Sequence, residues 1–180
     1  IALPLMLSLA ACGGEADTGA KGAASGEPIA AIPAPAGKNW SETVTKTDKG
    51  YYVLGNPEAP IKLIEYGSLS CPGCAKLAQD GYVPLVTNYV ASGRVSFEFR
   101  NFVREGLDLT MSVIARCGGA PSFFGLTRQM YADQPKFFET LQSADQSQLQ
   151  ALDALPGAQK MPRFAELAGL KQWAAMRGVP

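Results

Sequence analysis

The chain of 180 residues contains no histidine, and this absence excludes several kinds of catalytic site. Serine or cysteine nucleophiles that rely on an imidazole base cannot be built from it, nor can a zinc site with mixed histidine and cysteine ligands. The sequence also has no excess of one charge, since 16 Lys and Arg balance 16 Asp and Glu. A nucleic-acid-binding surface needs a clustered basic excess, so nucleic acid is not an expected partner.

Cysteine is scarce as well, with four in the whole chain: Cys12, Cys71, Cys74 and Cys117. Two of them form one pair three positions apart, and a zinc site made of cysteine alone would need a second pair. With Cys12 set aside, one pair and one spare cysteine are too few for a disulfide framework. We therefore expect no metal and no cofactor.

The N-terminal residues 1–11 are apolar and uncharged but too few to cross a bilayer, which takes about 20 residues. They run into Leu-Ala-Ala-Cys12-Gly, which resembles a bacterial lipobox, where signal peptidase cleaves before a cysteine that carries lipid. An ordinary secretory signal with an incidental cysteine is the alternative. We expect residues 1–11 to be a lipoprotein signal peptide and Cys12 to be lipidated. We also expect the start to be clipped, because neither Met nor a basic segment precedes Ile1.

Residues 12–39 are dominated by Gly, Ala, Pro and Ser with scattered charges. Such a composition cannot bury a core, so this segment is expected to be a flexible tether. Ordered structure is expected to begin near Trp40.

The next part of the chain predicts a strand–helix–strand unit. Strands are expected at 50–54, 61–66 and 95–100, and a helix at 72–91 with a kink at Pro84, which has no N–H to donate. The run at 61–66 is almost continuously apolar, as is typical of a parallel strand covered on both faces. Two parallel strands joined by a helix form a right-handed crossover.

Residues 107–178 show no strand pattern and are expected to form a block of helices. The predicted helices cover 109–117, 122–132, 135–142, 145–155 and 162–177. Ser122 and Asp145 are the expected N-caps, and Pro135 is expected to separate two of the helices.

The stretch Ser-Cys71-Pro72-Gly73-Cys74 follows the strand at 61–66 and opens the predicted helix. At such a position the first helical N–H groups have no internal partner, so they stabilise a thiolate and lower its pKa. Pro72 suits the first turn because its missing N–H removes a donor that would have no partner. The residues therefore predict an attacking cysteine, Cys71, and a resolving cysteine, Cys74, one turn further on.

Together these segments resemble a DsbA-type member of the thioredoxin superfamily. The matching parts are the strand and motif at 61–74, the strand at 95–102 and the helical block, within about residues 50–178. The resemblance implies a thioredoxin-like α/β fold with a helical insertion domain. In this division, residues 40–106 form the first thioredoxin half and residues 107–178 the insertion. Residues 179–180 are then a clipped end or the start of a truncated second half, which would carry the rest of the sheet.

The resemblance also implies a function as a thiol-disulfide oxidoreductase. The expected partners are exported proteins with thiols or disulfides, a membrane redox protein, and the membrane itself through the lipid on Cys12. The expected location is the periplasm. Cys71 would be the nucleophile and Cys74 the resolving cysteine. Pro-Gly replaces the Pro-His of the best-known oxidases between them, which predicts a weaker oxidant. The alternatives are a reductase or isomerase, a disulfide that never cycles, and a binding lipoprotein on a thioredoxin scaffold.

Glu65 lies six residues before Cys71, where the family places a buried acid beneath the active site. In that role Glu65 would have a raised pKa and carry a proton to or from Cys74. The alternative is a carboxylate that reaches solvent or pairs with Lys62.

Some remaining residues are expected to be structural. Cys117 is predicted to be a buried small hydrophobe on the face of Val113 and Ile114, with a third redox thiol as the alternative. Arg104 and Asp108 are expected to be ordinary surface charges, with a salt bridge at the hinge between sheet and helices as the alternative. The paired phenylalanines are expected in the core: Phe123, Phe124, Phe137 and Phe138.

The thioredoxin superfamily places a cis-proline opposite the cysteine pair. Pro180 could be that residue, but no strand follows it. We expect the cis-proline beyond the clipped end.

Overall fold

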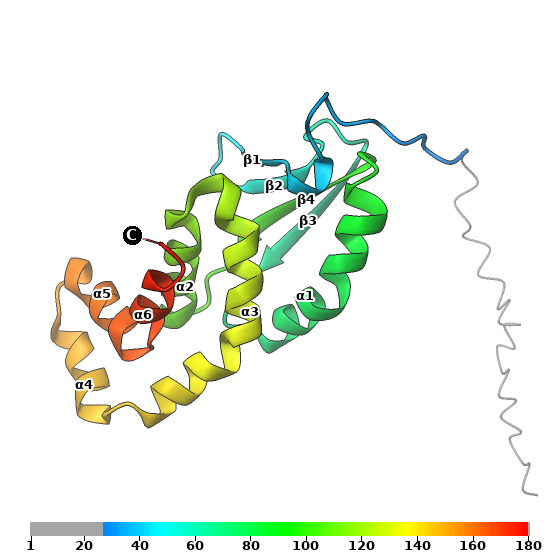
Figure 1. The fold of residues 1–180 in the computed structure, drawn as a ribbon. Coiled ribbons are helices and arrows are strands. Elements are labelled where there is room, and N and C mark those ends of the chain that lie inside the picture. The colour runs from blue at the N-terminus through cyan, green and yellow to red at the C-terminus, as the bar shows by residue number, and fades with distance from the viewer. Residues whose placement is uncertain (1–26, 180) are drawn as a thin grey trace, which may run out of the picture.

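The structure is a computed structural model, and it describes residues 27–179 (Figure 1). The expectations for the signal peptide, for lipid on Cys12 and for Pro180 fall outside these residues. The segment 27–39 has no helix or strand.

The end of that segment contacts the folded body. The backbone N–H of Ile32 donates to the carbonyl oxygen of Ser92 at 2.9 Å. The indole N–H of Trp40 donates to the carbonyl oxygen of Ile32 at 2.8 Å. Trp40 begins a short 3₁₀ helix, η1 (Trp40–Glu42), and is itself buried.

A four-stranded sheet forms the upper part of the molecule in Figure 1. Its strands are β1 (Val44–Lys46), β2 (Tyr52–Gly55), β3 (Ile61–Gly67) and β4 (Val95–Asn101), in the order β1-β2-β4-β3. Strands β3 and β4 are parallel, and the other two pairings are antiparallel. The three predicted strands are confirmed. Strand β1 was not predicted because its three residues carry no apolar alternation.

Helix α1 (Pro72–Leu85) connects β3 to β4, as the predicted crossover requires. The α-helical part ends one residue after Pro84, and a π-helical turn, η2 (Val86–Val90), continues to the loop before β4. The helix therefore changes type at the proline that lacks a donor for the carbonyl of Asp80.

Strand β3 is not covered on both faces, so that prediction is wrong. It pairs only with β4 within the described residues and lies at the edge of the sheet. Ile61, Leu63, Ile64 and Tyr66 are each more than 40% exposed. Because side chains alternate along a strand, Ile61 and Leu63 lie on one face and Ile64 and Tyr66 on the other, so neither face is fully covered within the described residues.

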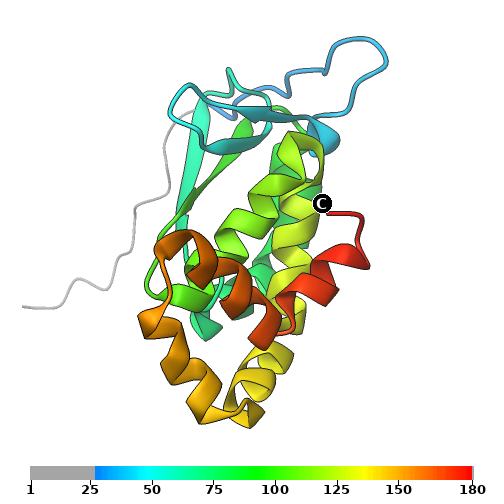
Figure 2. The same ribbon diagram turned by 90° about the vertical axis from the view of Figure 1, so that its left-hand side faces the viewer.

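The helical block comprises α2 (Gly106–Cys117), α3 (Gly119–Ser143), α4 (Gln146–Ala151), the 3₁₀ turn η3 (Leu152–Ala154), α5 (Gly157–Leu167) and α6 (Leu170–Ala175). Figure 1 shows α3 beside α1 and in front of the sheet. In Figures 1 and 2, the orange and red helices α4 to α6 lie at the end of the molecule away from the sheet.

Several predicted helix boundaries need correction. Pro135 does not end a helix but lies inside α3, whose second half changes direction in Figure 1. Ser122 is not an N-cap, since it lies within α3 and its hydroxyl donates to the carbonyl of Gly118. The helix predicted at 162–177 is two helices, because Gly169 has a φ of +72° and breaks the chain between α5 and α6.

One predicted cap is confirmed. The side chain of Asp145 accepts a hydrogen bond at 2.8 Å from the backbone N–H of Ser147 and so caps α4.

Aromatic side chains of the sheet and of α3 pack against one another in the core. Tyr52 of β2 stacks on Phe123, with ring centroids 4.0 Å apart, and Phe99 of β4 meets Phe123 edge-on at 5.7 Å. Phe97 packs against Phe124 at 5.5 Å. The four predicted phenylalanines therefore do contribute to packing, although Phe138 is only partly buried. These contacts fix α3 across one face of the sheet and bring its far end to the segment Cys71–Cys74.

Candidate active site

Cys71 lies where β3 passes to α1, at the N-cap position of the helix. Its backbone is extended, with φ −87° and ψ 119°, and Pro72 occupies the first helical turn. The carbonyl oxygen of Cys71 accepts the first helical hydrogen bond, from the N–H of Ala75 at 3.0 Å. The proline fixes the first turn, and the side chain of Cys71 is partly exposed beside the unpaired N–H groups.

The pKa of the Cys71 thiol is lowered by its surroundings. The largest cause is the backbone N–H of Cys74, and the Cys74 thiol, the N–H of Gly73 and the charge of Arg104 act in the same direction. Partial burial opposes them. The side chain of Cys71 makes no capping hydrogen bond in the structure, so the N–H groups at the start of α1 are not occupied by it. These donors therefore stabilise chiefly the thiolate of Cys71.

The pKa of the Cys74 thiol is raised, in the opposite sense. Burial is the main cause, and the neighbouring Cys71 and Glu65 add to it, although the backbone of Ser68 partly offsets the effect. Two thiols one helical turn apart thus differ in character. The surroundings favour the thiolate form at Cys71 and the neutral thiol at Cys74.

The loop between β3 and α1, residues 68–71, is held by two buried polar side chains of the helical block. Asp108 of α2 accepts hydrogen bonds from the hydroxyl of Ser68 at 2.5 Å and from the N–H of Leu69 at 2.9 Å. Gln134 of α3 donates its amide to the carbonyl oxygens of Leu69 at 2.7 Å and of Cys71 at 3.2 Å. The sequence indicates no role for Gln134, and it predicts a surface charge at Asp108.

Asp108 also corrects the prediction of a surface charge. Its side chain has no exposed surface, and it forms no ion pair with Arg104. The contact between these two residues is instead a hydrogen bond from the backbone N–H of Arg104 to Asp108 Oδ2 at 3.2 Å. Three donors therefore surround one carboxyl group, which suits a side chain that only accepts.

Glu65 lies on the inner face of β3, opposite Phe99 of β4. Burial raises the pKa of its carboxyl group. Its Oε1 atom is buried without a hydrogen-bond partner, so neither the predicted alternative of solvent contact nor that of pairing with Lys62 describes this oxygen. The amine of Lys62 donates instead to the carbonyl oxygen of Pro57.

Tyr131 of α3 is a second buried polar group without a partner, and sequence reasoning missed it too. Its hydroxyl and Glu65 line one apolar cavity of about 310 Å³ between β3, α1 and α3. Burial raises the pKa of Tyr131, and the nearby charges of Glu65 and Cys74 add to this. The three groups interact electrostatically, since Glu65 and Cys74 both raise the pKa of Tyr131 and Glu65 also raises the pKa of Cys74.

Cys117 is exposed, so the prediction of a buried residue is wrong. Helix α2 buries the face that carries Met111 and Ala115, whereas Val113, one turn before Cys117, is 37% exposed. The apolar stripe of α2 thus faces the core along a different line from the one that the sequence indicated.

Within residues 27–179, no helix is long and apolar enough to cross a bilayer. In the same range, no three histidine, cysteine, aspartate or glutamate side chains gather closely enough to hold a metal ion.

Comparison with known proteins places this geometry in a family. The thioredoxin family model matches residues 47–173. A protein of Rickettsia bellii named "Putative protein-disulfide oxidoreductase" is 32% identical over 89 residues, which cover 49% of this chain and 34% of the relative. "Disulfide bond formation protein D" of Bacillus subtilis is 30% identical over 67 residues, covering 37% of this chain and 30% of the relative.

A solved structure supports the same assignment. The protein-disulfide isomerase of Novosphingobium aromaticivorans is 28% identical, with a TM-score of 0.66 over 71% of this chain and 65% of that one. The expected thioredoxin-like α/β fold is thereby confirmed. The chain spans about a third of the length of the curated relatives it matches. On the family match over most of its folded part, the chain belongs to the thioredoxin family.

Proposed function

We propose that this chain is a thiol-disulfide oxidoreductase that exchanges disulfides with other proteins through Cys71 and Cys74. The observation that carries the proposal is the position of Cys71 at the N-cap of α1 with Cys74 in the first turn, where the surroundings shift the two thiol pKa values in opposite directions. The relatives named as disulfide oxidoreductases and disulfide bond formation proteins support it.

In the oxidising direction, Cys71 and Cys74 begin as a disulfide. A substrate thiolate attacks Sγ of Cys71, the Cys71–Cys74 bond breaks, and Cys74 leaves as a thiolate that takes up a proton. A second substrate thiolate then attacks the substrate sulfur of the mixed disulfide, which releases an oxidised substrate and the thiolate of Cys71. Because the environment stabilises that thiolate, Cys71 is a good leaving group and oxidation of substrate is favoured.

Glu65 is the proposed proton carrier for Cys74. A carboxyl group with a raised pKa retains its proton at a pH where an ordinary glutamate has lost it. Glu65 therefore supplies a proton when Cys74 leaves as a thiolate and takes one back when Cys74 attacks. Its unpartnered Oε1 and its effect on the pKa of Cys74 support this role.

We also propose that the protein works outside the cytoplasm. The lipobox-like segment ending at Cys12 supports export and a lipid anchor, with the periplasm as the location. Exported proteins with thiols or disulfides are then the substrates, and a membrane redox protein reoxidises the pair. Mass spectrometry of the mature protein tests the anchor, because a lipidated Cys12 adds the mass of the acyl chains.

Covalent trapping tests the exchange reaction. The reduced Cys74→Ser variant, incubated with a disulfide-linked peptide, is expected to accumulate a mixed disulfide at Cys71 that persists because no resolving thiol remains. The matched control is the double variant with Cys117→Ser, which should trap equally well. Absence of the adduct, or an adduct at Cys117 alone, would overturn the proposal and favour a binding protein without chemistry.

A disulfide isomerase is the second candidate, and the solved relative named protein-disulfide isomerase favours it. Oxidation of a reduced peptide and reshuffling of a scrambled one distinguish the two activities. A redox titration of the pair excludes both if the bond resists reduction below about −300 mV, as structural disulfides do.

A further inference from the structure

The loop that carries Cys71 depends on two side chains that come from far along the chain. Asp108 and Gln134 are each at most 3% exposed, and their hydrogen bonds reach 39 to 65 residues back along the sequence. The partners are backbone or hydroxyl groups of residues 68–71. Neither side chain touches a thiol sulfur through a hydrogen bond in the structure.

We propose that Asp108 and Gln134 are positioning residues through which the helical block sets the reactivity of Cys71. This inference rests on the proposed exchange function for its biological meaning. The two side chains keep the sulfur of Cys71 beside the N–H groups at the start of α1.

Asp108 acts through Ser68. Its carboxyl group holds the hydroxyl of Ser68 and the N–H of Leu69, and the carbonyl oxygen of Ser68 accepts the N–H of Cys71 at 3.1 Å. The turn from Ser68 to Cys71 is therefore anchored at its first residue. If this anchor is lost, the turn is free to shift, and Cys71 moves with it.

Gln134 acts on the other end of the same turn. Its amide donates to the carbonyl oxygen of Cys71, which also accepts the first helical hydrogen bond from Ala75. The side chain thus fixes the peptide unit at which the loop becomes helix. The N–H groups of Gly73 and Cys74, which stabilise the thiolate, follow directly from that unit.

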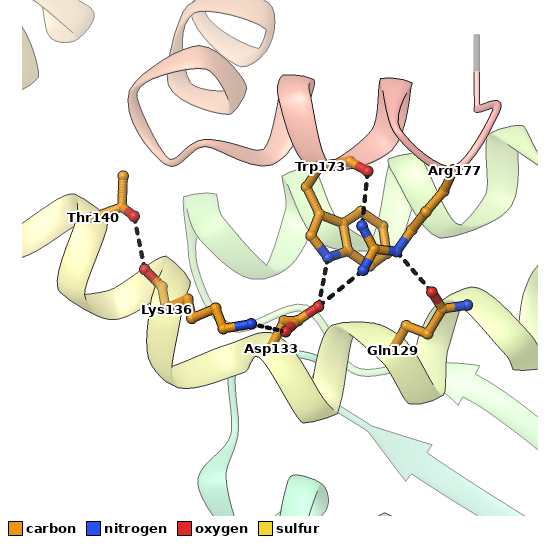
Figure 3. A network of polar contacts seen from close by, with 6 residues as sticks. All are labelled: Gln129, Asp133, Lys136, Thr140, Trp173 and Arg177. Carbon is orange, nitrogen blue, oxygen red and sulfur yellow. Dashed lines mark hydrogen bonds and ion pairs between the residues drawn. The ribbon is translucent and has the colours of Figure 1, made fainter.

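Asp133, the residue next to Gln134 on α3, provides an internal comparison. It accepts the indole N–H of Trp173 at 2.9 Å and pairs with Arg177 at 3.1 Å, which holds α6 against α3 (Figure 3). These contacts do not involve the redox loop. A change at Asp133 therefore disturbs the helical block without moving Cys71, whereas a change at Gln134 does both.

The test compares Asp108→Asn, Gln134→Ala and Asp133→Asn in the full chain, each in the Cys117→Ser background. The pH dependence of thiolate ultraviolet absorbance reports the pKa of Cys71, and a glutathione titration reports the reduction potential. Asp108→Asn leaves the N–H of Arg104 facing an amide donor, and Gln134→Ala frees the carbonyl of Cys71. We expect both to raise the pKa of Cys71 by about one unit, a tenfold change in the thiolate equilibrium.

If that tenfold change passes fully into the redox equilibrium, the potential of the pair falls by about 30 mV. Asp133→Asn should leave both quantities unchanged. Ser68→Ala is the milder variant if Asp108→Asn does not fold, since it removes only the hydroxyl that Asp108 holds, and it should shift the pKa in the same direction.

Two outcomes overturn the inference: an unchanged Cys71 pKa in Gln134→Ala and in a folded Asp108 or Ser68 variant, or an equal shift in Asp133→Asn. The trapping experiment is independent of both. If the Cys74→Ser variant fails to form a mixed disulfide while these pKa shifts appear, the positioning role stands and the exchange function does not.

Discussion

Two neighbouring residues of α3 hold two different parts of the molecule, and they do so with different chemistry. Gln134 fixes the loop 68–71 with neutral amide hydrogen bonds, while Asp133 holds α6 through a hydrogen bond from the indole of Trp173 and an ion pair with Arg177. The helix is the same and the two residues are consecutive, yet only Gln134 contacts the loop that carries Cys71.

The two contacts are expected to control different properties, namely the reactivity of the thiols and the stability of the fold. Groups that touch residues 68–71 are expected to change the thiol pKa values, and groups that touch α6 are expected to change the free energy of unfolding. The two contacts also differ in their response to pH, because Gln134 does not titrate and Asp133 does. Variants on the two sides should therefore give separable effects.

The largest expected effect is a loss of exchange rate on changing Cys71. Cys71→Ser should reduce the exchange rate to the uncatalysed background, a loss of more than about a thousandfold, because no other thiol lies at the helix start. Its free energy of unfolding should change by no more than about 0.5 kcal/mol in the reduced protein. Peptide oxidation and denaturant unfolding measure the two quantities. A variant with normal exchange through Cys117 would contradict the prediction.

The largest effect on the α6 side is expected for Trp173. Its indole is buried, meets Phe137 edge-on at 5.9 Å and lies under the guanidinium of Arg177 at 3.9 Å. Trp173→Ala should lower the free energy of unfolding by about 3 kcal/mol, as expected for a buried aromatic side chain. The pKa of Cys71 in the folded fraction should not change. A matching shift of that pKa would show that α6 and the redox loop are not independent.

Asp133 should make the stability of the contact between α3 and α6 depend on pH. Its pKa is held below the ordinary value of 3.8, chiefly by Lys136 and then by the indole of Trp173. The unfolded chain then binds the proton more tightly, so this stabilisation is present above pH 3.8 and is lost as the pH falls through the lowered value. Asp133→Asn should cost about 1 kcal/mol near neutral pH and little in acid. Unfolding curves across that range measure it, and an equal loss at every pH would contradict the assignment.

Glu65 should have the smallest effect on the free energy of unfolding, and its pH dependence should be opposite to that of Asp133. Burial raises its pKa above the ordinary value of 4.5, so the folded chain binds the proton more tightly. Its favourable contribution is complete below pH 4.5 and is lost as the pH rises through the folded value. Glu65→Gln should remove this decline in stability. It should also slow exchange where Glu65 is protonated, and an unchanged pH profile would exclude the proton-carrier role.

The local parts of the site were predictable from sequence. The strand at 61–67, the proline after Cys71 and the helix that follows are all encoded within 25 residues by apolar runs and helix-start chemistry. Asp108, Gln134 and Tyr131 were not predictable in the same way. The loop that Asp108 and Gln134 bind lies far away in the chain, as does Glu65, whose charge acts on Tyr131. A single polar residue in a helix also has no periodic signal that tells which face is buried.

Exposure was the other property that sequence reasoning misjudged. Strand β3 has the composition of a buried strand and lies at an edge, while Cys117 follows an apolar stripe and points outward. In both cases the neighbour that decides burial is set by tertiary packing. Apolar periodicity identifies the element, but it does not identify what covers each face.

A titration of the two thiols in the reduced full chain tests most directly whether the helix start activates Cys71. With Cys117→Ser to remove the third thiol, thiolate absorbance should rise in two steps, and alkylation with peptide mapping assigns each step to a cysteine. Cys71 is predicted to ionise below its ordinary value of 9.0 and Cys74 above it. Ionisation of Cys71 at or above that value, or of Cys74 first, would contradict the central claim.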